Sequence, residues 1–159
     1  RYLSWLDENV DKKTGFWCKG AKCTGLSPMR GAFHQYMIYD RLCAPLPKAD
    51  RALKTTLALQ RKNGLFDSKG PGWTEVAAVY VMDRAFRQCG KTFARVQTAL
   101  KAVARATGRK LGNDSFRRDA TPHRMAGVLS LAALIARALP GSVRSARPMR
   151  FYGDRRLFV

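Results

Sequence analysis

Two side chains stand out as candidates for acid-base chemistry. His34 lies in the aromatic stretch from Ala32 to Tyr39, and Glu75 follows the glycine-rich loop that ends at Gly72. A general acid needs a positioned carboxyl group with a raised pKa, usually with a partner, and the two residues could in principle face one cavity. The alternatives are a histidine satisfied inside the core and a first-turn glutamate that complements a helix dipole. We expect these structural roles for both residues.

The other arrangements that could support catalysis are incomplete. His123 directly follows Pro122 at the expected start of a helix, and neither histidine forms part of a Ser-His-Asp triad. Gly64, Gly70 and Gly72 lack the preceding strand and the Gly-Lys-Ser/Thr ending of a phosphate-binding loop. The sequence therefore predicts no catalytic residue, no cofactor and no enzymatic activity.

The cysteines raise the question of a metal site. Cys18 and Cys23 have the spacing C-x4-C, and His34 and Cys43 follow. A tetrahedral zinc site usually needs two close ligand pairs, and the second pair is missing here. Four cysteines, with Cys89 as the last, are also few for a secreted domain held by disulfides. We expect no metal, ordinary thiols and a reducing intracellular compartment.

Positive charge is concentrated in the second half of the chain. The 159 residues include 30 Lys and Arg against 11 Asp and Glu, for a net charge of +19. Residues 1–83 have a net charge of +5, whereas residues 84–159 carry +14, mostly as arginine. Because the guanidinium group pairs with phosphate in a planar, forked geometry, this bias favours a nucleic-acid partner.

The basic residues of the second half form two groups. One comprises an expected loop from Arg105 to Lys110 together with the pair Arg117 and Arg118, and the other is the C-terminal tail. In the tail, arginines alternate with aromatic residues, a combination that pairs with phosphates and stacks on unpaired bases. The predicted RNA-binding residues are Arg105, Arg109, Lys110, Arg117, Arg118, Arg144, Arg147, Arg150, Phe151, Tyr152, Arg155 and Arg156.

Apolar residues recur at intervals of three and four, and strand signals are nearly absent, which predicts an all-α fold. Proline and glycine divide the pattern into six expected helices. The first three cover about residues 2–10, 28–43 and 48–62, and the others begin near Trp73, Gly90 and Pro122. The last helix is apolar almost all round, so we expect it to be the most buried.

A repeat links the first two parts of the chain. Gly15-Phe16-Trp17 and Gly64-Leu65-Phe66 are 49 residues apart, and each closes a loop between two expected helices. The segment from Gln60 to Phe66 resembles the Gln-x-x-x-Gly-x-Trp repeat of the α/α-toroid families, the terpene cyclases and protein prenyltransferases. Phenylalanine replaces the tryptophan, Asp11 replaces the glutamine in the first copy, and a third copy near Gly108 lacks the aromatic residue. The resemblance covers residues 2–140 and implies stacked helical hairpins.

The expected architecture follows from this repeat. About three antiparallel helical hairpins over residues 1–140 would form a partial α/α-toroid or a short solenoid, followed by a basic arginine and aromatic tail over 141–159. Loop aromatics fill gaps between hairpins, so we expect four of them, and Leu3 and Leu6 in the first helix, to point inward. These aromatics are Trp5, Trp17, Phe66 and Trp73. No segment reaches the roughly 18 apolar residues of a membrane span, so we expect no membrane insertion.

Two functional classes result. The toroid enzymes have acidic clusters or a zinc site inside the ring, and the chain has no Asp-x-Asp-Asp run. The charge instead favours an RNA-binding scaffold subunit of a larger ribonucleoprotein, such as a mitochondrial ribosome, with RNA and neighbouring protein subunits as partners. The start at Arg1 suits an organellar matrix protein after removal of a targeting segment. The alternative is a toroid-type enzyme, or a fragment of one, acting on a carbohydrate, isoprenoid or polyanionic substrate.

Overall fold

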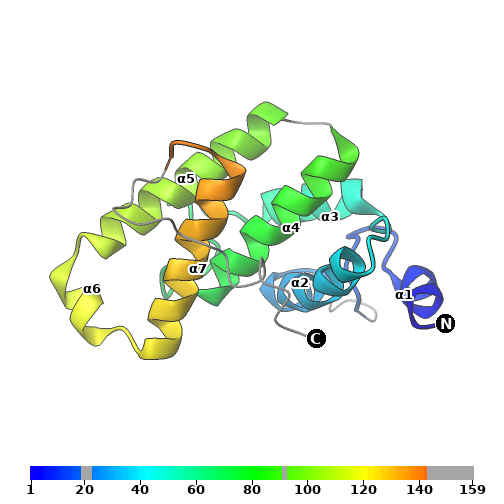
Figure 1. The fold of residues 1–159 in the computed structure, drawn as a ribbon, viewed down its shortest axis with the longest axis horizontal. Helices are drawn as coiled ribbons and strands as arrows, with labels where there is room; N and C mark the ends of the chain where they lie inside the picture. Colours follow the sequence, from blue (N-terminus) through cyan, green and yellow to red (C-terminus); the bar gives the residue numbers. More distant parts are fainter. Residues whose placement is uncertain (19–22, 91–92, 143–159) are drawn as a thin grey trace.

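The computed structural model describes residues 1–18, 23–90 and 93–142 (Figure 1). Over these ranges the chain is all-helical, as predicted, with seven helices and no strand. The helices are α1 (Tyr2–Asn9), α2 (Leu26–Arg41), α3 (Ala49–Ala58), α4 (Trp73–Cys89), α5 (Phe93–Leu111), α6 (Asp114–Asp119) and α7 (Pro122–Ala138).

The local sequence explains where several helices begin and end. Thr121 caps α7 by accepting a hydrogen bond from the backbone N–H of Arg124, and Pro122 occupies the first turn. Asn113 caps α6 in the same way through the N–H of Phe116. α4 ends at Gly90, which adopts a left-handed conformation with φ of 63°. Thr121-Pro122 and Gly90 were predicted as helix ends because each uses a residue type with a strong positional preference, whereas the cap at Asn113 was not predicted.

The sequence predicted too early an end for α5 and did not predict the short helix α6. α5 continues through Gly108 to Leu111, so the expected loop from Arg105 to Lys110 is helical and the proposed third repeat at Gly108 is wrong. A glycine inside a helix costs only about 1 kcal/mol relative to alanine. Burial of Val103 and Ala106 continues the apolar face of α5 almost to that glycine. Packing therefore outweighs the local preference for a turn.

α4 lies at the centre of the molecule (Figure 1). It packs against α2 and α3 on one side and against α5 and α7 on the other. Eleven of its 17 residues are buried, against seven of 17 in α7. The prediction that the last helix is the most buried is therefore wrong, because α7 packs mainly on α4 and α5 and leaves Leu129 exposed.

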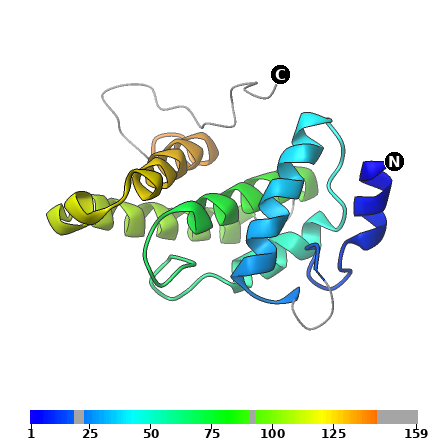
Figure 2. The same cartoon turned by 90° about the horizontal axis from the view of Figure 1, so that it is seen from below.

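The long axis of the molecule runs from α1 to α6. These two helices lie at opposite ends in both views (Figures 1 and 2). The arrangement of neighbours around α4 gives a helical assembly with one central helix. A toroid or solenoid remains a prediction from the sequence.

The two glycine loops of the repeat are built alike. Gly15 and Gly64 have φ of 75° and 87°, and an added Cβ would lie 2.5 Å from the Ala52 nitrogen and 2.7 Å from the Ala102 oxygen, respectively. Each glycine thus lets its loop pack against the backbone of a following helix, α3 or α5. Gln60 fastens the second loop, because its Nε2 donates to the oxygens of Gly64 at 2.9 Å and Ala99 at 3.0 Å.

Three of the four predicted gap-filling aromatics pack against the core. Phe66 is buried, and the partly buried Trp17 and Trp73 contact the core cluster. Trp5 was expected to point inward, but 54% of its surface is exposed. α1 turns Leu6 inward, which leaves the neighbouring position on the solvent side. In the described part of the chain, no helix is long and apolar enough to span a bilayer.

Candidate nucleic-acid interface

α5 carries four basic side chains, which we call the basic stripe: Arg95, Lys101, Arg105 and Arg109. All four are exposed. The last three are spaced four residues apart, which places them one above another with Cβ atoms about 5–6 Å apart. From Arg95 to Arg109 the stripe extends about 21 Å along the helix axis.

No acidic side chain of α5 compensates the charge of the basic stripe. α5 contains no Asp or Glu. No salt bridge joins a residue of the stripe to any other residue that the structure describes. Like charges four residues apart destabilise a helix by about 0.2–0.5 kcal/mol per pair. A bound polyanion would relieve this repulsion, so the stripe is a suitable surface for phosphate groups.

The predicted residues of α6 contribute less positive charge than expected. Arg117 and Arg118 are both exposed, as is Lys110 at the end of α5. Arg117 forms an ion pair with Asp114 of the same helix, and Asp119 ends α6. The two acids balance the two arginines, so the surplus charge in this region comes from α5.

Arg124 is basic but has a structural role. Its guanidinium group lies 4.9 Å above the ring centre of Phe116, a cation–π geometry. Its Nε donates to the Pro71 oxygen at 3.4 Å, and its Nη2 donates to the Lys69 oxygen. Arg124 thereby holds the loop before α4 against α6 and α7.

Arg95 and Lys101 were not among the residues predicted from the sequence to bind RNA. The signal was the four-residue spacing of Lys101 with Arg105 and Arg109, which becomes one surface only if the helix continues to Leu111. Because a loop was expected at 105–110, this spacing was not recognised as one helix face. The predicted tail residues, Arg144, Arg147, Arg150, Phe151, Tyr152, Arg155 and Arg156, lie outside the described residues.

Glu75 organises the loop before α4. One carboxylate oxygen accepts the backbone N–H groups of Phe66 at 3.1 Å and Asp67 at 2.9 Å, and the other accepts that of Gly72 at 2.9 Å. Burial raises the pKa of the Glu75 carboxyl group, while these hydrogen bonds oppose the rise. The structural role expected for Glu75 at the start of the helix is present, and it extends to the whole loop.

The two histidines do not join Glu75 in a site. His34 was expected to be a core residue, but its side chain is exposed beside the ring of Phe33, because this position falls on the solvent side of α2. His123 lies exposed in the first turn of α7, as predicted, and its backbone oxygen accepts a 3.0 Å hydrogen bond from the Trp73 indole. Glu75 is buried in α4, whereas His34 in α2 and His123 in α7 are exposed, so the three side chains do not form one site.

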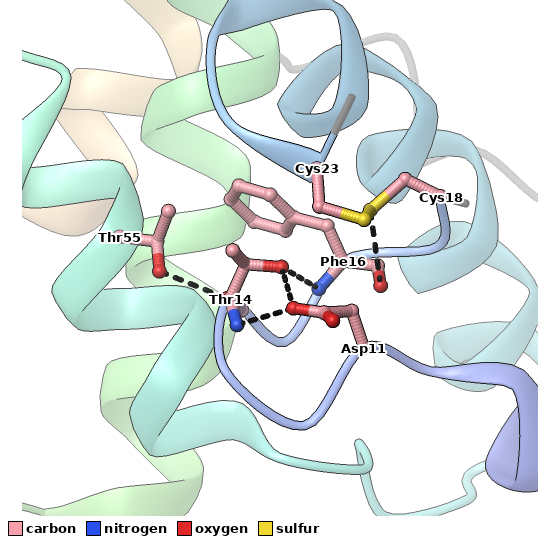
Figure 3. The surroundings of a disulfide bond; sticks show 6 residues. All are labelled: Asp11, Thr14, Phe16, Cys18, Cys23 and Thr55. Atoms are coloured by element: carbon pink, nitrogen blue, oxygen red, sulfur yellow. Dashed lines mark hydrogen bonds between the residues drawn. A yellow bond between two sulfur atoms is a disulfide. The ribbon is translucent and has the colours of Figure 1, made fainter. Parts of the chain in front are cut away.

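Cys18 and Cys23 form a disulfide, which corrects the expectation of unlinked thiols (Figure 3). Their Cα atoms are 5.1 Å apart, within the range that a disulfide requires. The bond lies beside Phe16, whose side chain is fully buried (Figure 3). The two cysteines are five positions apart in the sequence, so the bond is local. The low cysteine count argued against a disulfide framework but carried no information about a single local bond.

A second polar cluster joins α2 to α4. The Tyr80 hydroxyl donates to Asp40, and Arg84 forms an ion pair with the same carboxylate. Burial, with the nearby carboxylate adding to it, raises the pKa of Tyr80, so this hydroxyl stays protonated and acts as a donor. The cluster is balanced in charge and serves to connect the two helices.

Comparisons with known proteins add no assignment. The chain matches no family model, no curated protein and no solved structure. The resemblance to the α/α-toroid families therefore rests on the sequence repeat. Among the described residues, no group of three or more His, Cys, Asp or Glu side chains is placed to hold a metal ion.

Proposed function

We propose that the chain is an RNA-binding helical scaffold that contacts the phosphate backbone through the basic stripe of α5. One observation carries this proposal, namely four exposed cations along one helix that contains no acidic residue. Arginine and lysine in such a row neutralise successive phosphates and release condensed counterions. Lys110, exposed near the end of α5, adds a further positive charge to this helix.

The particle and its compartment stay predictions. The charge of the chain suits a subunit that packs against RNA within a larger assembly. The Cys18–Cys23 disulfide is more typical of oxidising compartments than of a reducing organellar matrix. The proposal therefore concerns the contact with RNA and does not depend on a ribosome.

The test removes charge from the stripe. The variant Lys101→Gln/Arg105→Gln/Arg109→Gln should bind a fluorescein-labelled 20-nucleotide RNA more weakly in anisotropy titrations between 50 and 300 mM KCl. For a single strand, loss of three phosphate contacts should reduce the slope of log K against log salt by about 2. Circular dichroism should show unchanged helix content, because glutamine is also a good helix former.

A matched control variant tests whether RNA binding depends on the position of the charges in α5 or only on the net charge of the chain. Lys12, Arg41 and Lys54 are exposed residues of the first half, and their triple replacement by Gln lowers the net charge by the same amount. This control should retain most of the affinity and salt slope. Equal weakening in both variants would mean that only the overall charge attracts RNA, and the assignment to α5 would then be wrong. Tighter binding of heparin than of RNA would contradict RNA as the partner.

A further inference from the structure

The loop between α3 and α4, residues 59–72, is fastened to the helix that carries the basic stripe. Gln60 Nε2 donates to the Ala99 oxygen of α5 at 3.0 Å. A Cβ added at Gly64 would lie 2.7 Å from the Ala102 oxygen, so the two backbones touch there. Ala102 directly follows Lys101 of the stripe, a step of about 100° around the helix axis. The loop therefore lies along the flank of the stripe.

Two exposed cations, Arg61 and Lys62, lie at the tip of this loop, and we call them the loop pair. The Arg61 N–H donates to the Leu65 oxygen at 2.8 Å, and the Gly64 N–H donates to the Arg61 oxygen at 2.9 Å. The tip is thus a closed turn that holds the loop pair next to the contact with α5. Neither residue forms a salt bridge within the part of the chain that the structure describes.

The loop contains one acidic residue, Asp67, whose carboxylate is bonded further along the same loop. It accepts the backbone N–H of Lys69 at 3.0 Å and the hydroxyl of Thr74 at 3.2 Å. The loop pair therefore adds positive charge beside the stripe. Because the loop packs directly on the backbone of α5, the two sets of cations are separated by roughly 10 Å, the diameter of a helix with its side chains.

The surface around these two sets of cations suits a double helix better than a single strand. Single strands are held largely by aromatic side chains on which successive bases stack. Among the side chains that the structure describes, the large exposed hydrophobic ones are Tyr2, Trp5, Leu42 and Leu129, and none of these lies on α5 or in the loop. Double-stranded RNA is recognised by its shape and by contacts to phosphates and 2′-hydroxyls across the minor groove, without stacking.

We infer that the RNA partner is double-stranded, with the basic stripe on the phosphates of one strand and the loop pair on those of the other. The inference rests on the proposed function, since it requires the stripe to bind phosphates. It adds the class of RNA and two contact residues, Arg61 and Lys62. It also gives Gln60 a positioning role, because its hydrogen bond to α5 fixes the loop beside the stripe.

The test compares a fluorescein-labelled RNA duplex of 20 base pairs with the same labelled strand alone. The full chain is titrated against each in anisotropy experiments between 50 and 300 mM KCl. Arg61→Gln/Lys62→Gln should reduce the slope of log K against log salt for the duplex by about 2, since each phosphate contact to a double helix contributes about 0.9. The slope for the single strand should not change, because one strand follows the stripe alone.

The first glycine loop supplies a matched control. Lys12 and Lys13 are exposed, and they precede Gly15 as Arg61 and Lys62 precede Gly64. Lys12→Gln/Lys13→Gln removes the same charge from a loop built alike and should retain the duplex slope. Circular dichroism should show the same helix content for both double variants, because all four positions are exposed and lie outside the helices.

The variants separate this inference from the proposed function. If the triple variant of the stripe weakens binding but the loop-pair variant keeps the duplex slope, the stripe binds RNA and the inference about the loop is wrong. Equal loss of slope on duplex and single strand would show that both sets of cations hold one strand, which would also overturn it. So would tighter binding of the single strand than of the duplex, or an equal loss in the Lys12 and Lys13 control. A stripe variant that bound both RNA forms unchanged would refute the proposed function itself.

Discussion

The carboxylate of Glu75 accepts a hydrogen bond from the backbone N–H of Phe66, nine residues earlier, at 3.1 Å. The same oxygen accepts from Asp67, and the second oxygen accepts from Gly72. One buried side chain therefore satisfies three backbone donors of the loop before α4. The loop and the central helix become one unit, and Phe66 is held in the core.

Glu75→Gln should lower the free energy of unfolding by about 2–3 kcal/mol, because the amide group can accept from only one side and opposes the remaining donors. Urea denaturation of the two proteins measures the difference. Glu8→Gln, on the exposed surface of α1, is the control and should change stability by less than about 0.5 kcal/mol. Equal stability of Glu75→Gln and the unmodified chain would contradict the role of the carboxylate.

The close approach of the repeat loop to α5 predicts a strong effect at Gly64. Gly64→Ala places a Cβ 2.7 Å from the Ala102 oxygen, and Gly90→Ala places one in open space, although both glycines have positive φ. Gly90→Ala should therefore show only the backbone strain, about 1 kcal/mol. Gly64→Ala should cost about 1–3 kcal/mol more, from overpacking. Thermal unfolding of both variants measures the two losses of stability. Equal losses would contradict the close contact between Gly64 and Ala102.

Trp5 and Trp17 should differ in their contribution to stability. Trp17 donates its indole N–H to the Leu6 oxygen at 2.8 Å and stacks with Tyr39 at 5.9 Å between ring centres. Trp17→Ala should cost about 3–5 kcal/mol. Trp5→Ala, at an exposed position, should cost less than about 1 kcal/mol. If denaturant titrations showed a larger loss of stability for Trp5→Ala than for Trp17→Ala, the packing of Trp17 against the core would be contradicted.

The disulfide should stabilise the chain by a modest amount. A loop as short as that between Cys18 and Cys23 gives about 2 kcal/mol in the chain-entropy description. Replacing both cysteines by serine, or adding dithiothreitol, should lower the free energy of unfolding by about this amount. Cys43→Ser, at an exposed thiol, is the control. Insensitivity of the unmodified chain to dithiothreitol would show that the bond is absent in solution.

Asp11 should make stability depend on pH in the acid range. Its carboxylate accepts from the Thr14 hydroxyl and the Thr14 backbone N–H, both at 2.7 Å, and these bonds lower the pKa of the carboxyl group. A lowered pKa in the folded state contributes stability at neutral pH, and that stability is lost as pH falls below the ordinary value of about 3.9.

Asp11→Asn keeps the shape of the side chain but removes its titration. At pH 7 the unmodified chain should be more stable by about 1 kcal/mol, because bonds to a charged acceptor are stronger than bonds to an amide. Urea titrations should show this margin shrinking between about pH 4 and pH 2. A margin that grew with acid would mean that the carboxyl pKa is raised on folding.

The sequence predicted helix ends and tight loops well where they depend on residue types with a fixed positional preference. Thr121-Pro122 and Gly90 marked helix ends correctly, and Gly15 and Gly64 marked the two tight loops. Where long-range packing decides the outcome, the predictions failed. Burial of Val103 and Ala106 carried α5 past Gly108, and the neighbours of α4 made it the central helix in place of α7.

The candidate site could be predicted only in part, for the same reason. Arg105 and Arg109 were recognised by charge, but their alignment with Lys101 needed the correct helix end. His34 could not be placed, because an aromatic neighbourhood in sequence does not decide which face of α2 it occupies. The Cys18–Cys23 disulfide is local, but nothing in the sequence distinguished it from two free thiols.

The central position of α4 has a consequence for how the molecule opens. Of the four helices that pack on α4, α2 and α3 precede it in the sequence and α5 and α7 follow it. α4 is therefore fully exposed to water only when both pairs separate from it. Its amide protons should therefore exchange with deuterium only through global unfolding, whereas those of α1 and α6 exchange through local fraying. Segments on both sides of α4 must be synthesised before its surface is covered, so the chain cannot complete its core until α7 has left the ribosome.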